Sequence, residues 1–373
     1  MQREHLEEIT ALRHRLHERA ELAMEERQTK ETLIRFLKER TALEVEDRGR
    51  WFYAHYRSGN RAAPALAFRS DFDALAIDEG PGLPYRSRNA GVSHRCGHDG
   101  HSAALAGLAL EADKLGAGRD LYFIFQHAEE IGGGGEECAG LITEKGIAQV
   151  YAFHNMSGYP LGSVMVCDGV TQCASKGLTV RFLGTPAHAS QPEDGRNPAG
   201  AAARLVLKSQ EAAAADGFSG MVMATVVQVA VGNKNFGIAA HRGEVSMTLR
   251  ADYERDLEHL EETIRRYAGH LAENEGLSVS FGESDVFPET VNDPACARLV
   301  REAAQACGYP VVAMKKPFRA SEDFGHYLKR CPGAMFYLGN GESYAQLHTS
   351  GYDFNDRILE RAVELFKKII ELA

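Results

Sequence analysis

The sequence contains no long hydrophobic run, and this absence argues against a membrane-spanning protein. A transmembrane helix needs about 20 consecutive apolar residues, and no segment approaches that length. The opening segment MQREHLEEITALRHRLHERAE is charged along its length, whereas a signal peptide has an apolar centre. We therefore expect neither a membrane partner nor a secretion signal.

The sequence also lacks an excess of basic residues. It has 42 Lys and Arg against 52 Asp and Glu, which gives a formal net charge of -10. Nucleic acids and anionic membranes are bound by basic stripes, so we expect no nucleic-acid partner. The charge is typical of the solvated acidic surface of a soluble protein.

A disulfide framework is the third missing feature. The seven cysteines are odd in number and irregularly spaced, which favours a reducing cytoplasm over a secreted scaffold. We expect a cytoplasmic protein. All cysteines except Cys96 are expected to be small core residues, namely Cys138, Cys167, Cys173, Cys296, Cys307 and Cys331.

The length and pattern of the chain predict two domains. A chain of 373 residues is too long for one ordinary domain. Strands alternate with helices through residue 168, which indicates an α/β domain with a central, mostly parallel sheet flanked by helices. From about residue 174 a strand-helix-strand-strand-helix pattern predicts a smaller α+β unit. We expect a first domain of residues 1–172 and 284–373, interrupted by an inserted domain of residues 173–283.

Polar side chains follow the predicted strands of the first domain. Asp71 and Asp73 come at the end of one apolar run, Glu129 and Glu130 directly after another, and His154 at the end of a third. Ligand sites of parallel sheets gather beyond the carboxyl ends of the strands. The sequence therefore predicts a site at this edge of the sheet.

The segment HRCGHDGHS, residues 94–102, has the composition of a metal loop. Cys96 and His98 are separated by one glycine, so both side chains can turn toward one site. Thiolate and imidazole are good ligands for zinc and related divalent metals. His94 and His101 are as consistent with supporting or helix-capping roles as with metal binding.

The adjacent pair Glu129 and Glu130 indicates a division of roles. A glycine run, residues 132–135, follows the pair and lets backbone pass close by. Two neighbouring carboxylates repel each other unless a cation separates them; one then binds metal while the other stays free as a base. A solvated pair of surface charges is the alternative reading.

Taken together, the candidate ligands are too many for one tetrahedral zinc and suit two metals about 3.5–4 Å apart. Glu129 would take the proton of a water between them. Carboxylates such as those of Asp71 and Asp73 commonly orient a metal-bound histidine. The predicted ligands are Cys96, His98, Glu130, His154 and His348.

These motifs resemble the amidohydrolase branch of the metallopeptidase superfamily that includes aminoacylases, carboxypeptidases and succinyl-diaminopimelate desuccinylase. CGHDGH together with the strand-borne AEE carries the resemblance, and RSDFDALAI, GTPAHASQPEDGRNP, ASEDF and LHTSGYDF add to it. Hippurate hydrolases and plant auxin-conjugate hydrolases are similar. The resemblance implies two divalent ions, manganese or zinc, with cobalt or nickel also open. It implies Glu129 as general base and proton donor to the leaving amine, and Asp73 as support for the ligand geometry.

For the inserted domain the resemblance implies a lid that can also form a homodimer. His188 would reach the scissile carbonyl and help to hold the oxyanion. Asn235 and Arg250 would face the substrate, where Arg250 could bind a carboxylate bidentately; a surface role for Arg250 is equally open. The segment NFGIAAHRG lacks the family's Asn-x-Ile-Pro, so the acyl preference is not carried over.

The predicted activity is hydrolysis of the amide bond of an N-acyl or N-aroyl amino acid, which releases a carboxylate and a free amino acid. A dipeptidase or carboxypeptidase on the same two-metal site is one alternative. A metal-dependent binding protein without turnover is another, and the free carboxylate of Glu129 argues against it. His127 replaces a family proline, and strand alternation would put it on the side of Glu129; we expect it to pack.

Overall fold

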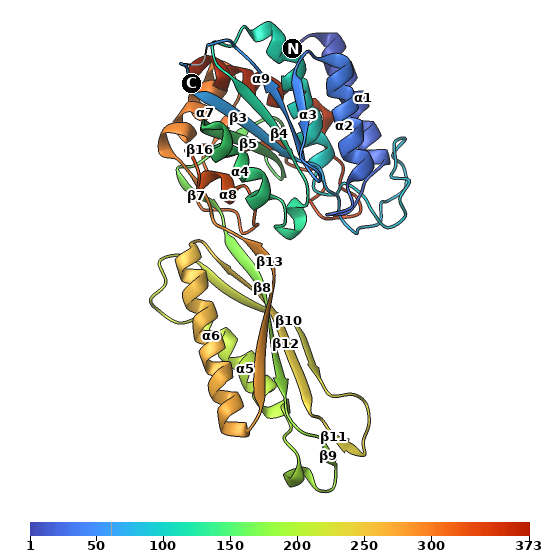
Figure 1. The fold of residues 1–373 in the computed structure, drawn as a ribbon, viewed down its shortest axis with the longest axis vertical. Helices are drawn as coiled ribbons and strands as arrows, with labels where there is room; N and C mark the ends of the chain where they lie inside the picture. Colours follow the sequence, from blue (N-terminus) through green and yellow to red (C-terminus); the bar gives the residue numbers. More distant parts are fainter. Residues whose placement is uncertain (61) are drawn as a thin grey trace. The chain divides into compact units, whose positions relative to one another are not determined.

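The computed structural model describes residues 1–60 and 62–373, and these form two compact units (Figure 1). Unit 1 comprises Met1–Thr171, Thr290–Lys316 and Glu322–Ala373. Unit 2 comprises Gln172–Glu289 and Pro317–Ser321. The second unit is therefore built from two separate stretches of chain.

Unit 1 is organised around an eight-stranded sheet whose centre is parallel. Strands β4, β3, β5 and β16 are neighbours in this order and run parallel. On one side β2 and β1 are added antiparallel, and on the other β6 is antiparallel to β16. The predicted mostly parallel sheet is thereby confirmed. The strands in spatial order are β1 (Glu44–Asp47), β2 (Phe52–Tyr56), β4 (Leu121–Gln126), β3 (Ala65–Asp71), β5 (Ile147–Ser157), β16 (Gly333–Gly341), β6 (Val164–Met165) and β15 (Val311–Val312).

Helices cover both faces of this sheet. The main core joins one face, through side chains such as Phe68 and Phe123, to α1 (Arg3–Glu18), α2 (Arg27–Arg40), α3 (His98–Leu115), α7 (Pro294–Ala306) and α9 (Leu359–Leu372). The alternate side chains, among them Gln126, face α4 (Gly135–Lys145) and α8 (Gly325–Leu328). Because neither face meets water, β4 is buried throughout, and its sequence is a nearly continuous apolar run.

Short elements complete unit 1. Strands β7 (Gly169–Gln172) and β14 (Thr290–Asn292) pair with each other, and single turns of 3-10 helix form at η1 (Glu129–Ile131) and η3 (Asp356–Ile358). The η1 turn follows β4 directly, so the end of a central strand delivers Glu129 and Glu130.

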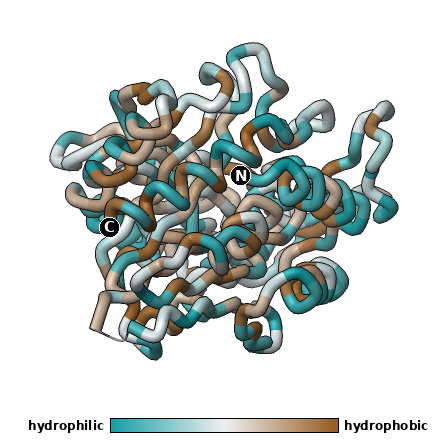
Figure 2. Tube along the Cα trace, turned by 90° about the horizontal axis from the view of Figure 1, so that it is seen from above, coloured by the Kyte–Doolittle hydropathy of each residue, from teal (hydrophilic) through white to brown (hydrophobic). Residues whose placement is uncertain are grey.

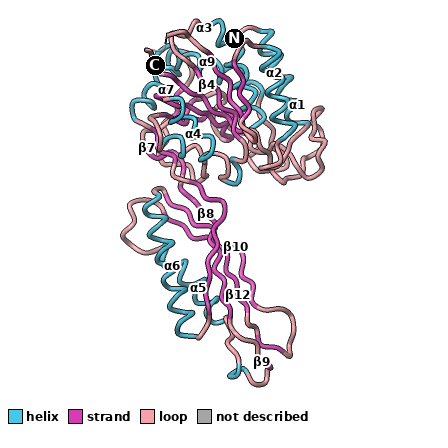
Figure 3. The backbone as a smooth tube through the Cα atoms, in the orientation of Figure 1, coloured by secondary structure: helices cyan, strands magenta, loops and turns pink. Residues whose placement is uncertain are grey.

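Unit 2 is a four-stranded antiparallel sheet with two helices on one face (Figure 3). Alternate residues of its central strands, such as Val180 and Met247, form a second core with the helices. The sheet has the order β10 (Val222–Val231), β12 (Arg242–Ala251), β8 (Ala174–Leu183) and β13 (Ser278–Phe287), and its helices are α5 (Ala199–Ala213) and α6 (Glu254–Glu275). A separate ladder pairs β9 (Ala187–His188) with β11 (Ile238–Ala239), and η2 (Pro192–Asp194) follows β9.

The hydropathy of the helices agrees with their packing, in which one face of each helix is turned to a core. In Figure 2 hydrophilic and hydrophobic residues alternate along them. Among the described residues, no helix combines the length and the apolar character needed to cross a membrane.

Candidate metal centre

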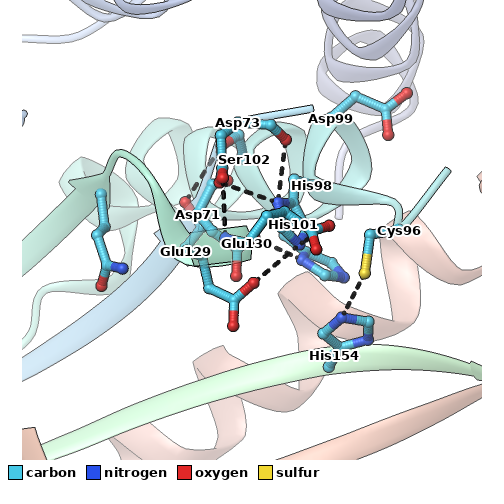
Figure 4. Close-up of polar contacts among 12 residues, drawn as sticks. Asp71, Asp73, Cys96, His98, Asp99, His101, Ser102, Glu129, Glu130 and His154 are labelled. Carbon is cyan, nitrogen blue, oxygen red and sulfur yellow. Dashed lines mark hydrogen bonds and ion pairs between the residues drawn. The ribbon is translucent and has the colours of Figure 1, made fainter. Parts of the chain in front are cut away.

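The five predicted ligands all lie in unit 1, at or beyond the carboxyl ends of its parallel strands. Figure 4 shows four of them, namely Cys96, His98, Glu130 and His154. Cys96 and His98 flank the start of α3, Glu130 lies in η1, and His154 lies in β5. His348 comes from the loop between β16 and η3. Distant parts of the sequence thus meet at one edge of the sheet.

Gly97 allows the turn that brings Cys96 and His98 to the same place. Its φ is +101°, a conformation that L side chains rarely adopt. A Cβ atom there would also lie 2.3 Å from Oδ1 of Asn155. Both the conformation and the space at this position therefore require glycine, and α3 begins directly after it.

Two overlapping groups of ligand atoms form around the Cys96 thiol. Sγ of Cys96 lies 3.3 Å from Nε2 of His154 and 3.3 Å from Nε2 of His348. Cys96, His98 and His154 have ligand atoms within 4.8 Å of one another, and so do Cys96, Glu130 and His348. These sets are the five predicted ligands, with Cys96 common to both.

The donor atoms fit divalent cations. Nε2 of His98 and Oε1 of Glu130 are buried and have no hydrogen-bond partner among the described residues, a costly state for polar atoms unless another group binds them. The Nε2 of His98 lies 3.7 Å from Oε1 of Glu130, close enough for both to face one ion. Burial and then Glu130 raise the pKa of the Cys96 thiol, and a cation would reverse this effect because it favours the thiolate.

Asp73 and the main chain orient the histidines. Nδ1 of His98 lies 3.0 Å from the carbonyl oxygen of Asp73 and 3.2 Å from its Oδ1. Nδ1 of His154 lies 2.7 Å from the carbonyl oxygen of Asn155. When these Nδ1 atoms carry the proton and donate, the Nε2 lone pairs are free for metal. Asp73 also accepts from the backbone N–H of Glu130 at 2.9 Å, so it touches both a histidine and a glutamate segment.

Glu129 is a buried carboxylate beside the ligands. Its Oε2 lies 3.8 Å from Nε2 of His98, and only 5% of the residue is exposed. Burial, and then the charge of Glu322, raise the pKa of Glu129 well above its usual value. A carboxylate with raised proton affinity next to a metal centre is suited to accept a proton from water.

Sequence reasoning missed a buried ionic network behind Glu129. The Arg69 guanidinium is fully buried and lies 2.6 Å from Asp71, 3.0 Å from Glu322 and 2.7 Å from Asp323. Glu322 and Asp323 belong to ASEDF, a motif that adds to the family resemblance without indicating a role for either residue. The signal that was available was this acidic pair, together with an arginine inside an apolar strand.

His101 and His127 have structural partners. His101 lies 2.7 Å from Asp71 and 2.6 Å from Oδ1 of Asn155, so both ring nitrogens are engaged in support of the site. His127 is buried, with Nδ1 4.0 Å from Sγ of Cys138 in α4. It packs, but the expected alternation with Glu129 does not apply because β4 ends at Gln126.

The three residues predicted to face the substrate lie in unit 2. His188 is exposed, and its Nδ1 lies 2.7 Å from Oγ of Ser190. Oδ1 of Asn235 accepts from the N–H of Gly237. Nη1 of Arg250 donates to the carbonyl of Arg319 at 2.9 Å and to Oγ of Ser321 at 2.8 Å. Arg250 thus anchors the segment Pro317–Ser321 within unit 2.

Comparisons with known proteins find relatives that match nearly the whole chain. The hippurate hydrolase of Campylobacter jejuni is 28% identical over 379 residues, which cover 97% of this chain and 95% of the relative. An N-acetylcysteine deacetylase of Bacillus subtilis is 27% identical over 368 residues, covering 96% and 94%. The crystal structure of YxeP from Bacillus subtilis, described as a dinuclear metal-binding peptidase of the M20 family, has a TM-score of 0.84 at 24% identity and full coverage of both chains.

The family model "Peptidase family M20/M25/M40" matches residues 67–372. This range begins in β3 and ends in α9, so it contains every predicted ligand and the whole of unit 2. The resemblance inferred from the sequence motifs is confirmed. The chain belongs to peptidase family M20/M25/M40.

Proposed function

We propose that this protein hydrolyses the amide bond of an N-acyl or N-aroyl amino acid. The observation that carries the proposal is the buried carboxylate of Glu129, whose Oε2 lies 3.8 Å from Nε2 of the predicted ligand His98. A pure binding protein has no use for such a base. The hippurate hydrolase and N-acetylcysteine deacetylase relatives support an acylated amino acid as substrate.

Two divalent ions would be held by Cys96, His98 and His154, and by Cys96, Glu130 and His348. When bound, they supply positive charge that polarises the amide carbonyl and lowers the pKa of a water molecule. Manganese or zinc is our first choice, and cobalt and nickel suit the same mixed donors.

Glu129 would hold and move the proton. It accepts a proton from the water whose oxygen adds to the carbonyl carbon, and it then donates that proton to the amide nitrogen as the C–N bond breaks. Through its hydrogen bonds, Asp73 would hold His98 and the backbone of Glu130 in place during both proton transfers. The products are a carboxylate and a free amino group.

For unit 2 we propose the roles expected from the sequence. His188 would donate to the developing oxyanion, supported by its exposed position and by the Ser190 hydroxyl at Nδ1. Asn235 and Arg250 would bind polar parts of the substrate. The unit would act as an inserted lid and as the contact between two copies of the chain. We also propose a reducing, cytoplasmic location, because all seven cysteines are free thiols.

The test is a comparison of Glu129→Gln with Glu136→Gln, an exposed neighbour outside the site. Both are assayed on N-acetyl and N-benzoyl amino acids and on dipeptides, with added manganese, zinc or cobalt. We expect Glu129→Gln to lower kcat by about 10²–10⁴-fold with unchanged metal content, and Glu136→Gln to resemble the wild type. Normal turnover by Glu129→Gln would refute the assignment of Glu129 as the base. If the wild type cleaves dipeptides faster than N-acyl amino acids, the protein is a dipeptidase.

A further inference from the structure

The loop that carries Glu129 and Glu130 is held by carboxylates from three distant segments. Ala128 N–H donates to Oε1 of Glu26 at 2.8 Å, and Gly135 N–H donates to Oδ2 of Asp323 at 2.8 Å. Between them, Glu130 N–H donates to Asp73. All three acceptors are buried, so these contacts replace hydrogen bonds to water.

Of these contacts, the one at Ala128 restrains a strained residue. Ala128 has φ +51° and ψ 40°, a left-handed conformation that a residue with a Cβ atom disfavours. It stands at the N-terminal boundary of η1, directly before Glu129. Its conformation therefore sets the direction in which the chain leaves β4 and presents the two glutamates.

Glu26 is itself fixed against the site. Only 5% of it is exposed, and it lies at the start of α2. Earlier in the same turn, Leu22 bridges to Ala74, and the carbonyl of Glu21 accepts from the N–H of Ala74 at 2.8 Å. The opening turn is thus tied to the segment that follows Asp73, and Glu26 reaches Ala128 from this anchored position.

We propose that Glu26 is a positioning residue for Glu129 and Glu130. By accepting the Ala128 N–H it holds the left-handed conformation, and this places the base and one metal ligand. The inference rests on the proposed function, in which Glu129 is the base. Asp73 also orients His98, and Asp323 also binds Arg69, so Glu26 is the acceptor whose removal tests the loop most directly.

The experiment compares Glu26→Ala, Glu26→Gln and the double variant Glu26→Ala/Ala128→Gly in the full chain, with Glu25→Ala as an exposed control. We expect Glu26→Ala to lower kcat at least about 10-fold with little change in KM, because a displaced base weakens the chemical step. Glu26→Gln keeps an oxygen acceptor and should stay within about 3-fold of the wild type. Glycine at 128 adopts the left-handed conformation without strain, so the double variant should recover most of kcat.

A second readout is independent of activity. Amide hydrogen exchange of residues 127–135 in the metal-free protein should be faster in Glu26→Ala and close to wild type in Glu26→Gln. Wild-type exchange and kcat in Glu26→Ala would overturn the proposal. So would a folded Glu26→Ala with reduced kcat that Ala128→Gly does not restore. If Glu26→Ala fails to fold, restored folding and turnover in the double variant support the proposal, and a double variant that also fails contradicts it.

The two proposals fail in different ways. Turnover by Glu129→Gln refutes the proposed function, whatever Glu26 does. An inactive Glu129→Gln together with a wild-type Glu26→Ala leaves the proposed function intact and removes only the role of Glu26.

Discussion

At the scale of single residues, the metal centre is surrounded by buried groups that make more than one contact. Asp73 binds His98 and the backbone of Glu130. Within the metal loop, Asp99 lies 2.8 Å from Nδ1 of His17, whose Nε2 lies 3.0 Å from Glu79. Removing one member of such a network leaves a partner buried and unpaired, so its effect reaches beyond the residue replaced.

Asp73→Asn should weaken metal binding about 10- to 100-fold, because supporting partners of ligands have effects of this size. The side chain keeps its shape, but an amide offers one acceptor oxygen in place of two for His98 and Glu130. Titration of the metal-free protein with manganese or zinc measures the change. Asp78→Asn, at an exposed position in the same loop, is the control. Equal affinities in the two variants would contradict the role of Asp73.

His17 should make stability depend on pH. Burial lowers its pKa, but hydrogen bonds to Asp99 and Glu79 outweigh burial and raise the pKa from 6.5 to about 9. Folding thus favours the protonated form of His17. Its contribution to the free energy of unfolding is complete below pH 6.5 and is lost as pH rises through about 9. The loss is on the order of 3 kcal/mol. Urea unfolding of the metal-free protein between pH 6 and 9.5 should show it.

In the same pH series, the free energy of unfolding of His17→Gln should lack the decrease that His17 causes. His270→Gln, in unit 2, should show the same decrease as the wild type. Parallel pH curves for the wild type and His17→Gln would show that His17 is not the group responsible.

Sequence analysis named the metal-binding candidates because each stands in or beside a recognisable motif, and the structure brings five of them together. It missed Glu26, Arg69 and the role of ASEDF for a physical reason. Glu26 meets Ala128 across 102 positions of sequence, and Arg69 meets Asp323 across 254. Contacts between residues so far apart produce no local periodicity or motif spacing in the sequence from which they could be predicted.

At the scale of elements, space requires the last two glycines of the run between β4 and α4. A Cβ atom on Gly134 would lie 1.9 Å from the carbonyl oxygen of His127, and one on Gly135 would lie 2.5 Å from that of Asp323. Neither glycine has a positive φ. The run therefore allows α4 to begin against Asp323, close behind the two glutamates.

Gly135→Ala should push the first turn of α4 away from Asp323 and lower the free energy of unfolding by about 1–3 kcal/mol. Metal affinity should fall with it, because Glu130 lies in the same loop. Gly140→Ala, later in α4, meets only Nη1 of Arg330 at 3.6 Å and should be neutral or slightly stabilising. Urea unfolding measures both variants; equal free energies would show that the loop accommodates the added methyl group.

The elements that were predicted well are those with long patterns. The central strands are recognisable because both of their faces are buried, and the long helices because one face is apolar. The inserted domain is expected at residues 173–283; in the structure β13 continues to Phe287, and unit 2 includes Gln172–Glu289. Pro317–Ser321 joins unit 2 through contacts such as that with Arg250. No local sequence pattern predicts such a contact.

At the scale of the whole molecule, each unit has its own hydrophobic core. All predicted metal ligands belong to unit 1. Binding of metal stabilises the part that holds it, by about 2.7 kcal/mol when the free metal exceeds Kd 100-fold.

Chelation of the metal should therefore lower the Tm of the transition in which unit 1 unfolds. The Tm of a second transition, that of unit 2, should stay nearly unchanged. Scanning calorimetry with and without EDTA measures this, and readdition of manganese or zinc should reverse the shift. A Tm that does not respond to chelator or metal would contradict the assignment of the centre.

The proposed dimer can be tested on β10. This strand forms an edge of the unit 2 sheet and exposes Val227 (63%) and Val229 (50%), and exposed apolar edges favour pairing with another strand. Val227→Lys/Val229→Lys should turn a dimer into a monomer in sedimentation velocity. Leu207→Lys, at an exposed position in α5, should remain dimeric. A monomeric wild type at micromolar concentration would refute this interface.

The late position of β16 in the chain has a consequence for synthesis. This strand lies between β5 and β6 in the sheet, yet it is made only after all of unit 2, and His348 follows it. A nascent chain on the ribosome must therefore keep a gap in its main sheet while unit 2 emerges and can fold. Cys96 and the acidic residues around it are therefore translated well before the centre can close around metal, which requires His348.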